Sequence, residues 1–346
     1  MKEVLCWRRL ARGSSVSTVP DDLERMPDDS PQPGALDLLA IMATPGIGPA
    51  RALAIAADPE RLSEAKGLPG VEQASEHYVT LIGRAMDAGI RVYGFFDEGF
   101  PQRLQGIPSP PAVLWVRGEL PPVRARGVAV VGTRTPSVES KEATRQAVLT
   151  LPLDEWVLVS GLAAGIDTVA HEAALDAGIL TMAVLGSGVD SPTPTENLDL
   201  ADRIVAAGGC LVSEQPPGEP VSPASLVQRN RLQAGLSEAV IVGEMGLEGG
   251  TAHTVRYAVE QGREVLCLVD SHGDGFGDGS RELLTSGPPL LCDKLPAWHG
   301  REKLARGVNT PTVAGAVAPT ELLAEAITAR SSAGGPVPPA QLGFDV

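Results

Sequence analysis

The chain has 346 residues, which is enough for a sizeable hydrophobic core and about two domains. Aromatic residues make up only 3% of it, while 39 glycines and 30 prolines are present, so the core must consist of Ala, Val, Leu and Ile, as is typical of an α/β protein with many tight turns. The net charge of −15 excludes a protein that coats duplex nucleic acid through a broad positive field, so an anionic ligand would have to be held by a few placed residues.

The beginning of the chain predicts a leader and a small helical domain. Residues 1–34 include a Ser-, Pro- and Asp-rich stretch without apolar periodicity, which predicts a disordered leader. From residue 35 the pattern fits two helix-turn-helix units joined by Gly-rich turns. The turn P-G-I-G-P at 45–49 resembles that of a helix-hairpin-helix, whose amides meet a nucleic-acid phosphate. A tight turn without a ligand is the alternative interpretation.

Two short strands, at 90–95 and 112–118, precede a Pro-Pro pair at 121–122. We expect this pair to mark the end of a domain that covers residues 35–120.

Six apolar runs of three to five residues, separated by helix-length segments, follow from residue 121 to 295. They lie at 128–131, 157–159, 181–185, 210–212, 239–242 and 265–269. Continuous apolar runs that alternate with amphipathic helices predict a parallel sheet covered by helices on both faces. Residues 296–346 are rich in Ala, Pro, Thr and Gly, and predict a loosely ordered tail with one short helix at 320–330.

The cysteine and hydropathy patterns predict a cytoplasmic protein without a membrane segment. The four cysteines lie far apart and show no C-x-x-C spacing, which indicates reduced thiols. No stretch approaches 18 consecutive apolar residues, and the first 12 residues lack the apolar region of a signal peptide. The five histidines show no zinc spacing, so we expect no metal.

Glycine clusters follow four of the predicted strands at the point where each strand ends. In an open parallel sheet, ligands bind beyond the carboxyl ends of the strands, where helix N-termini direct their backbone amides. Each cluster alone is also consistent with a tight turn or a helix cap. Together they predict a phosphate-binding edge, and its candidate residues are Gly132, Thr133, Ser160, Gly161, Gly186, Gly188, Gly249, Gly250 and Thr251.

Positively charged residues are few at this predicted edge. Arg134 directly follows the first of the six strands, and Arg229, Asn230 and Arg231 lie close to a predicted helix start. A guanidinium binds phosphate through two parallel hydrogen bonds and keeps its charge at all relevant pH values. We interpret these residues as candidate phosphate ligands, with surface ion pairs as the alternative.

Motifs for catalysis are weak. Neither G-x-G-x-x-G nor G-x-x-x-x-G-K-[ST] is present, so dinucleotide and P-loop binding are not supported. Asp167 and His171 lie four residues apart on one helix face, where they are either a catalytic pair or a helix-start carboxylate and a histidine packed on the sheet. We favour the second interpretation, and we expect neither enzyme activity nor a cofactor.

Taken together, several segments in order over residues 35–295 resemble the DNA-processing protein A (DprA/Smf) family. The motifs are D-E-G-F-P-Q-R-L from 97, P-P-A-V-L-W-V-R-G from 110, V-A-V-V-G-T-R from 128, V-S-G-L-A-A-G-I-D-T-V-A-H from 159, A-V-L-G-S-G-V-D from 183, R-N-R-L-Q-A-G-L-S from 229 and A-V-E-Q-G-R-E-V from 258. The resemblance implies an extended Rossmann-like domain preceded by a helical, SAM-like or helix-hairpin-helix domain. It also implies a homodimer without a known catalytic step, which binds and protects single-stranded DNA and loads RecA onto it during natural transformation.

By motif, Arg134 corresponds to the phosphate-contacting arginine of the family, and Gly132 and Thr133 to its turn. The chain also departs from the family pattern. Ala164 stands where the family has an arginine, and Glu248 where it usually has Lys or Arg. The S-G-S that follows is replaced by G-G-T at 249–251, and no winged-helix domain is recognisable in 296–346. Losing two phosphate contacts would weaken DNA binding by more than about tenfold.

Two other functions remain open. One is a nucleotide-ligand module of the wider SLOG superfamily, because the G-G-T at 249–251 resembles the P-G-G-x-G-T-x-x-E loop of LOG phosphoribohydrolases. Against cleavage, Thr254 occupies the place of that loop's catalytic Glu, which leaves Glu244 as the carboxylate able to enter the pocket. The other is a partner-binding scaffold with a vestigial pocket.

Overall fold

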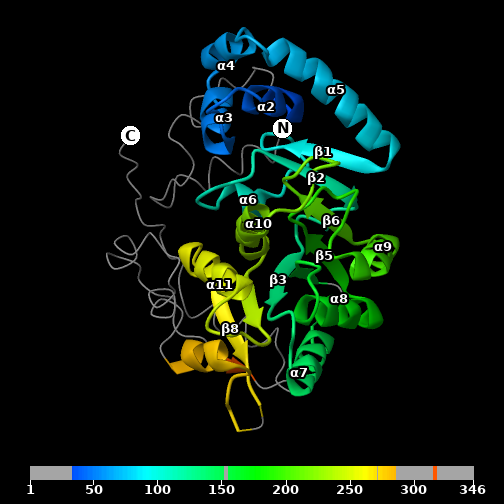
Figure 1. The fold of residues 1–346 in the computed structure, drawn as a ribbon, viewed down its shortest axis with the longest axis vertical. Coiled ribbons are helices and arrows are strands. Elements are labelled where there is room, and N and C mark those ends of the chain that lie inside the picture. Colours follow the sequence, from blue (N-terminus) through cyan, green and yellow to red (C-terminus); the bar gives the residue numbers. More distant parts are fainter. Residues whose placement is uncertain (1–32, 152–154, 271, 286–314, 318–346) are drawn as a thin grey trace.

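A computed structural model describes residues 33–151, 155–270, 272–285 and 315–317 (Figure 1). Almost all of the predicted leader, the predicted helix at 320–330, two of the four cysteines and most of the predicted tail lie outside the described residues. The prediction that residues 296–346 contain no winged-helix domain also concerns residues that lie almost entirely outside the described part.

The N-terminal part is helical, as predicted, and lies at one end of the molecule (Figure 1). Its helices are α2 (Ala35–Met42), α3 (Pro49–Ala56), α4 (Pro59–Lys66) and α5 (Val71–Asp87). The side chain of Asp58 begins α4 by accepting hydrogen bonds from the amides of Glu60 and Arg61 at 2.9 and 3.2 Å. Gly70, in the turn before α5, has a φ of 87°, a left-handed conformation that favours glycine.

One nine-stranded sheet runs through the molecule in the order β1-β2-β6-β5-β4-β3-β7-β8-β9. The strands are β1 (Ile90–Gly94), β2 (Val113–Gly118), β3 (Arg126–Val131), β4 (Trp156–Ser160), β5 (Leu180–Val184), β6 (Cys210–Ser213), β7 (Ala239–Val242), β8 (Glu264–Leu268) and β9 (Gly315–Val317). The six apolar runs correspond to β3 to β8, all mutually parallel, so the predicted parallel sheet is confirmed.

The strands β1 and β2 are antiparallel and extend this same sheet. They pair with each other, and β2 also pairs antiparallel with β6 through Trp115 and Ser213. The helical part and the parallel sheet are thus joined by backbone hydrogen bonds across the predicted boundary. The division at residue 120 itself stays a prediction.

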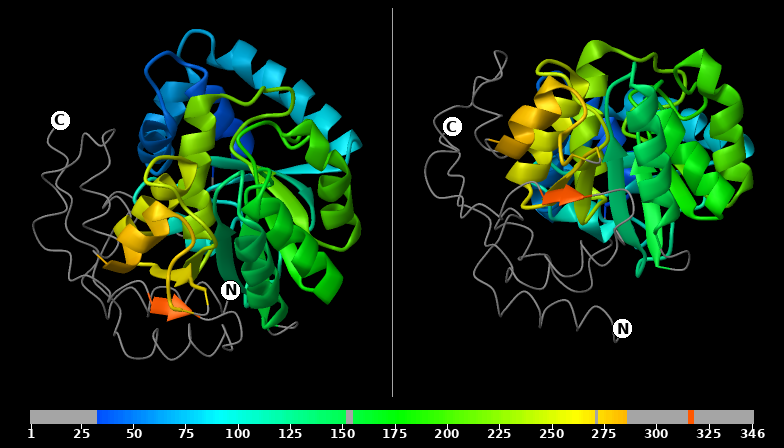
Figure 2. Two further views of the ribbon diagram at one scale, coloured as in Figure 1. Left: turned by 60° about the horizontal axis from the view of Figure 1, so that its bottom comes forward. Right: turned by 90° about the horizontal axis from the view of Figure 1, so that it is seen from below.

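Helices cover both faces of the sheet (Figures 1 and 2). One face carries α7 (Val138–Leu149), α8 (Ile166–Ala177) and α9 (Leu198–Ala206), and the other carries α10 (Pro223–Gly235) and α11 (Gly250–Glu260). Two short segments, α6 (Gln102–Gln105) and η2 (Thr195–Asn197), lie in the connections, and residues 278–285 are also helical. The placement of helices on both faces follows from right-handed crossovers. The chain adds strands in one direction from β3 to β6 and in the opposite direction from β7 to β8, so the connecting helices lie on opposite faces.

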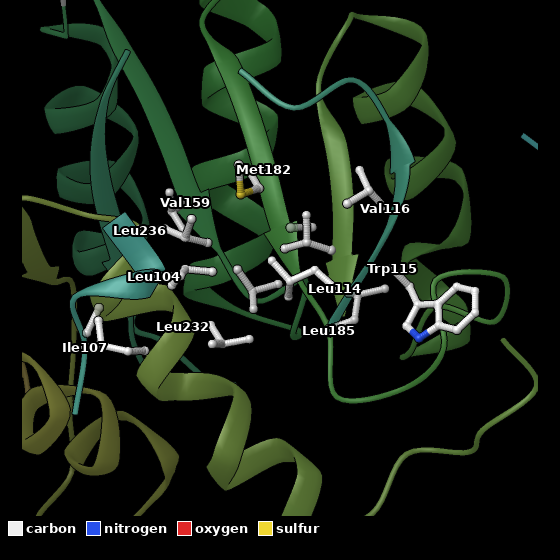
Figure 3. Close-up of a cluster of buried hydrophobic side chains, with 14 of the residues drawn as sticks. Leu104, Ile107, Leu114, Trp115, Val116, Val159, Met182, Leu185, Leu232 and Leu236 are labelled. Carbon is white, nitrogen blue, oxygen red and sulfur yellow. The ribbon is translucent and has the colours of Figure 1, made fainter. Parts of the chain in front are cut away.

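The core is aliphatic, as the composition predicts. Figure 3 shows Leu104 and Ile107 from the segment around α6 packed near Leu232 and Leu236 at the end of α10. Trp115 is fully buried on β2. Each methylene buried in such a core contributes about 0.8 kcal/mol.

Two of the cysteines predicted to be reduced thiols lie on described strands, Cys210 on β6 and Cys267 on β8, and both are free and buried. Burial raises the pKa of Cys210 to about 12 and that of Cys267 to about 11. None of the helices in the described part of the chain is long and apolar enough to cross a membrane.

Candidate functional site

The candidate site lies at the carboxyl edge of the parallel strands. Between β3 and β7 the chain reverses its direction across the sheet, since β4 to β6 lie on one side of β3 and β7 lies on the other. Ligands in open α/β sheets bind at such a switch point. The loops after β3, β4 and β7 meet there, and together with the end of β4 and the start of α11 they contain eight of the thirteen predicted site residues.

The loop after β3 presents Arg134 to solvent. The amide of Thr133 donates to the carbonyl of Glu244 at 2.8 Å, which ties this loop to the one after β7. A second tie involves Ser137, which caps α7 and donates from both its amide and its hydroxyl to Glu244 Oε2 at 2.8 Å. The position of Arg134 is therefore set by contacts on either side of it in the sequence.

The turn between β4 and α8 is tightly held from within. Ser160 is buried and donates to the carbonyl of Val130 at 2.6 Å. Leu162 has a φ of 60°, a conformation that is uncommon for residues other than glycine. The side chain of Asn197 secures it by donating to the Leu162 carbonyl at 2.8 Å. Ala164, at the tip of the turn, is exposed.

Asp167 is the internal anchor of this turn. It is 4% exposed, and its Oδ2 accepts from the amides of Gly161 and Ala163 at 3.1 and 3.3 Å. Burial raises the pKa of its carboxyl group, against the opposing effect of Arg229 and the backbone hydrogen bonds. These contacts support the interpretation of Asp167 as a helix-start carboxylate that receives backbone amides.

His171 is also engaged internally. It is fully buried, and its Nδ1 lies 2.7 Å from Oγ1 of Thr181 on β5. Burial, with a smaller effect of Arg229, lowers the pKa of His171 to about 3. Asp167 and His171 thus have separate partners, which supports a structural role for both rather than a catalytic pair.

The residues Arg229, Asn230 and Arg231 on α10, predicted from the sequence as candidate phosphate ligands, make most of their contacts within the protein. Arg229 is only 8% exposed, donates to the carbonyl of Val184 at 2.6 Å, and lies 3.9 Å from Asp167. Arg231 forms two hydrogen bonds of 2.6 Å with Glu214. Asn230 donates to the carbonyl of Gly250 at 3.2 Å and so connects α10 to the start of α11.

The remaining glycine clusters differ in exposure. Gly186 and Gly188, after β5, are buried, and Gly186 packs against Leu226 of α10. By contrast, Gly249 and Gly250 are exposed at the start of α11, where no described side chain caps the helix. Thr251 follows them and is largely buried. An open set of backbone amides therefore exists at α11 but not after β5.

Glycosidic cleavage requires a carboxylate that is free to act as an acid or base in a pocket. The described residues near the start of α11 do not offer this arrangement. Oε2 of Glu244 accepts both hydrogen bonds from Ser137, and Thr254 is a buried residue of α11. Glu248 is exposed in the loop after β7. The arrangement favours Glu244 as a structural residue.

Sequence reasoning missed two features of this site. Asn197 and the Ser137–Glu244 hydrogen bonds position the loops that carry the predicted residues. A Ser directly before a helix-length segment is a weak N-cap signal, and it indicates Ser137. We find no sequence signal for Asn197, because its partners Leu162 and Thr168 are about 30 residues away.

Comparison with known proteins gives consistent matches. The family described as DNA recombination-mediator protein A matches residues 91–295. The DNA processing protein DprA of Bacillus subtilis is 34% identical over 222 residues, which are 64% of this chain and 74% of that protein. DprA of Streptococcus pneumoniae is 37% identical over 199 residues, or 58% of this chain and 70% of that protein. Protein Smf of Escherichia coli is 37% identical over 197 residues, or 57% of this chain and 53% of that protein.

Two solved structures confirm the fold. The X-ray structure of DprA from Streptococcus pneumoniae matches with a TM-score of 0.55 and 33% identity, and the match covers 65% of this chain and 80% of that one. DprA from Helicobacter pylori, whose single-stranded DNA binding mode has been described, matches with a TM-score of 0.53 and 23% identity over 70% of this chain and 96% of that one. The predicted α/β class with a Rossmann-like sheet and a helical N-terminal part is confirmed.

Proposed function

Because this chain belongs to the DNA recombination-mediator protein A family, we propose that it is a DNA-processing recombination mediator that binds single-stranded DNA at the carboxyl edge of its sheet. The relative from Helicobacter pylori binds single-stranded DNA, and the fold described above is shared with it. Arg134, the glycine turns and the start of α11 form the proposed contact surface, while the buried residues of the predicted set support it from below.

The observation that carries this proposal is the position of Arg134. Its side chain is exposed at the switch point of the sheet, and both ends of its loop are tied to Glu244. An exposed guanidinium on a fixed loop binds a phosphate with little loss of conformational entropy. Phosphate contacts of this kind supply most of the affinity for single strands without reading their sequence.

Removing this side chain tests the proposal. Arg134→Ala is expected to weaken binding of a labelled oligo-dT about tenfold or more, since hydrogen bonds to charged groups are worth about 1.5 to 3 kcal/mol. It should also reduce the dependence of log K on log salt by about one unit. Fluorescence anisotropy titrations at two salt concentrations measure both quantities.

Arg124→Ala is the matched control for this variant. Arg124 is exposed and lies two residues before β3 begins, at the opposite edge of the sheet. Removal of the Arg124 side chain should change the affinity for oligo-dT by less than about twofold if the DNA strand follows the carboxyl edge of the sheet. Equal affinities of a folded Arg134→Ala protein and its parent would contradict the proposed function.

The two departures from the family pattern give a gain-of-binding prediction. Ala164 and Glu248 are both exposed on loops at this edge. Ala164→Arg combined with Glu248→Lys should therefore tighten oligo-dT binding and steepen the salt dependence by about one to two units. If the double variant binds like its parent in the same titrations, these positions do not face the DNA.

The finer parts of the function are proposals that rest on the family alone. We propose that the protein acts in the cytoplasm as a homodimer, protects incoming single-stranded DNA during natural transformation and passes it to RecA. No enzyme activity is proposed, because Glu244 is occupied with Ser137. A nucleotide-binding module is the second candidate, which the uncapped start of α11 favours.

A further inference from the structure

Arg229 occupies an unusual place for a residue predicted to hold a phosphate. Its guanidinium lies against Gly161, so closely that a β-carbon built on Gly161 would collide with it. One nitrogen donates to the carbonyl of Val184 at the end of β5, and another lies 3.9 Å from Asp167. Arg229 is 8% exposed, which leaves little of the fork available to a ligand in solvent.

A continuous series of contacts leads from Arg229 to Arg134. Asp167, beside Arg229, accepts the amides of Gly161 and Ala163 and so fixes the turn after β4. At the end of that turn, the amide of Ile166 donates to the carbonyl of Thr133 at 3.1 Å. Gly165, with a φ of 86°, lies against the backbone of Thr133 and Arg134 so closely that a side chain there would collide with it.

We propose that Arg229 is a positioning residue for the DNA site: together with Asp167 it holds the Gly161–Ile166 turn, on which the Arg134 loop rests. The inference rests on the proposed function and deepens it, because it assigns the phosphate contact to Arg134 and the geometry of the site to Arg229. Arg229 thus contributes to affinity through Arg134 and adds no phosphate contact of its own.

The electrostatics are consistent with this division. Burial lowers the pKa of the Arg229 guanidinium, Asp167 opposes that effect, and the like charge of Arg134 adds to it. Asp167 is therefore the counter-ion of a buried cation, and Arg134 is the cation left for a ligand at the surface. Removing one partner of a buried pair is costlier than removing an exposed ion pair.

Salt dependence separates a positioning residue from a phosphate ligand when the charge itself is removed. We expect Arg229→Lys and Asp167→Asn each to weaken oligo-dT binding about fivefold to tenfold, with a salt slope that falls by no more than in Arg134→Ala, because the phosphate contact they disturb is that of Arg134. In the Arg134→Ala/Arg229→Gln protein the slope should equal that of Arg134→Ala, whereas a phosphate contact made by Arg229 itself would lower it by about one further unit. Arg263→Lys is the matched control, since Arg263 is a largely buried arginine next to β8 at the opposite edge and bonds to the Gly235 carbonyl.

A double-variant cycle adds a second criterion. If Arg229 acts through Arg134, the Arg134→Ala/Arg229→Lys protein should bind within about twofold of Arg134→Ala alone, because coupled residues are not additive. Additive losses, or a slope that falls by a further unit, would overturn the inference. Should Arg229→Lys not fold, Asp167→Asn combined with Arg134→Ala completes the same cycle.

Hydrogen exchange of the free protein tests the positioning without DNA. The amides of Gly161, Ala163, Ile166 and Thr133 should exchange at least about tenfold faster in Arg229→Lys and Asp167→Asn than in the parent or in Arg263→Lys. Unchanged exchange at these four amides would refute the inference even if DNA binding fell. A parent protein that does not bind oligo-dT would refute the proposed function, while the exchange result would still decide the role of Arg229.

Discussion

A Gly161→Ala protein is expected to lose about 3 kcal/mol of unfolding free energy, because the added methyl group displaces a buried guanidinium that has nowhere to move. Gly161 lies against Arg229, and Arg229 is held between the carbonyl of Val184 and the carboxylate of Asp167. To relieve the collision, the Arg229 guanidinium would have to move and lose its hydrogen bond to the Val184 carbonyl. Urea unfolding followed by circular dichroism measures the loss.

Gly83→Ala is the control for this change. Gly83 lies inside α5, one turn before its end, where an added β-carbon meets no atom within 4 Å. Alanine there should raise the unfolding free energy by about 0.5 to 1 kcal/mol, since it reduces the entropy of the unfolded chain and favours the helix. Similar, small effects of the two substitutions would mean that Arg229 is not fixed as described.

The unfolding free energy of the protein should decrease steeply as the pH falls below neutrality, because of His171. The unfolded chain takes up a proton at this residue near its ordinary pKa of about 6.5, whereas the folded protein holds it neutral down to a pKa of about 3. Between these values the unfolded state binds more protons, so the unfolding free energy decreases as the pH falls. The expected loss is about 2 kcal/mol between pH 7 and pH 5.

The geometry around His171 explains why it stays neutral. The Thr181 hydroxyl donates to the carbonyl of Leu158 at 3.2 Å, so its oxygen accepts from Nδ1 of His171. Nε2 is then the unprotonated nitrogen, and it is buried with no hydrogen-bond partner among the described residues. A proton on Nε2 would place a charge among apolar side chains, near the guanidinium of Arg229.

His171→Asn tests this expectation, because the asparagine amide can still donate to Thr181 but cannot take up a proton. Its unfolding free energy, measured by urea titration from pH 7 to pH 5, should vary about 2 kcal/mol less than that of the parent. Asp167 works in the opposite direction, because its raised pKa lets the folded protein bind a proton that the unfolded chain does not. A profile in His171→Asn equal to that of the parent would disprove the assignment.

The fold was predictable from the sequence where the signal is local. Each strand from β3 to β8 is a continuous apolar run between helix-length segments, and such runs occur where helices cover both faces of a sheet. The antiparallel pairing of β2 with β6 was not predictable, because it joins segments about 100 residues apart and leaves no local pattern.

The site was predictable only in part, for a similar reason. The order of strands and glycine turns places Arg134 at the carboxyl edge, and the structure shows it exposed there. Whether an arginine faces solvent or a buried carboxylate depends on residues distant in the chain. Arg229 contacts Val184 and Asp167, and Arg231 contacts Glu214. These partners come together only in the folded chain, so the local sequence does not indicate them.

The pairing of β2 with β6 has a consequence for how the protein emerges from the ribosome. β2 is made early, but its hydrogen-bonding partner β6 is made about 100 residues later, which at about 5 to 20 residues per second means a delay of about 5 to 20 seconds. During that time the antiparallel β1–β2 pair presents an unpaired, strongly apolar edge that contains Trp115. Nascent chains halted between β2 and β6 are therefore the species in which chaperone contact and aggregation of this protein should concentrate.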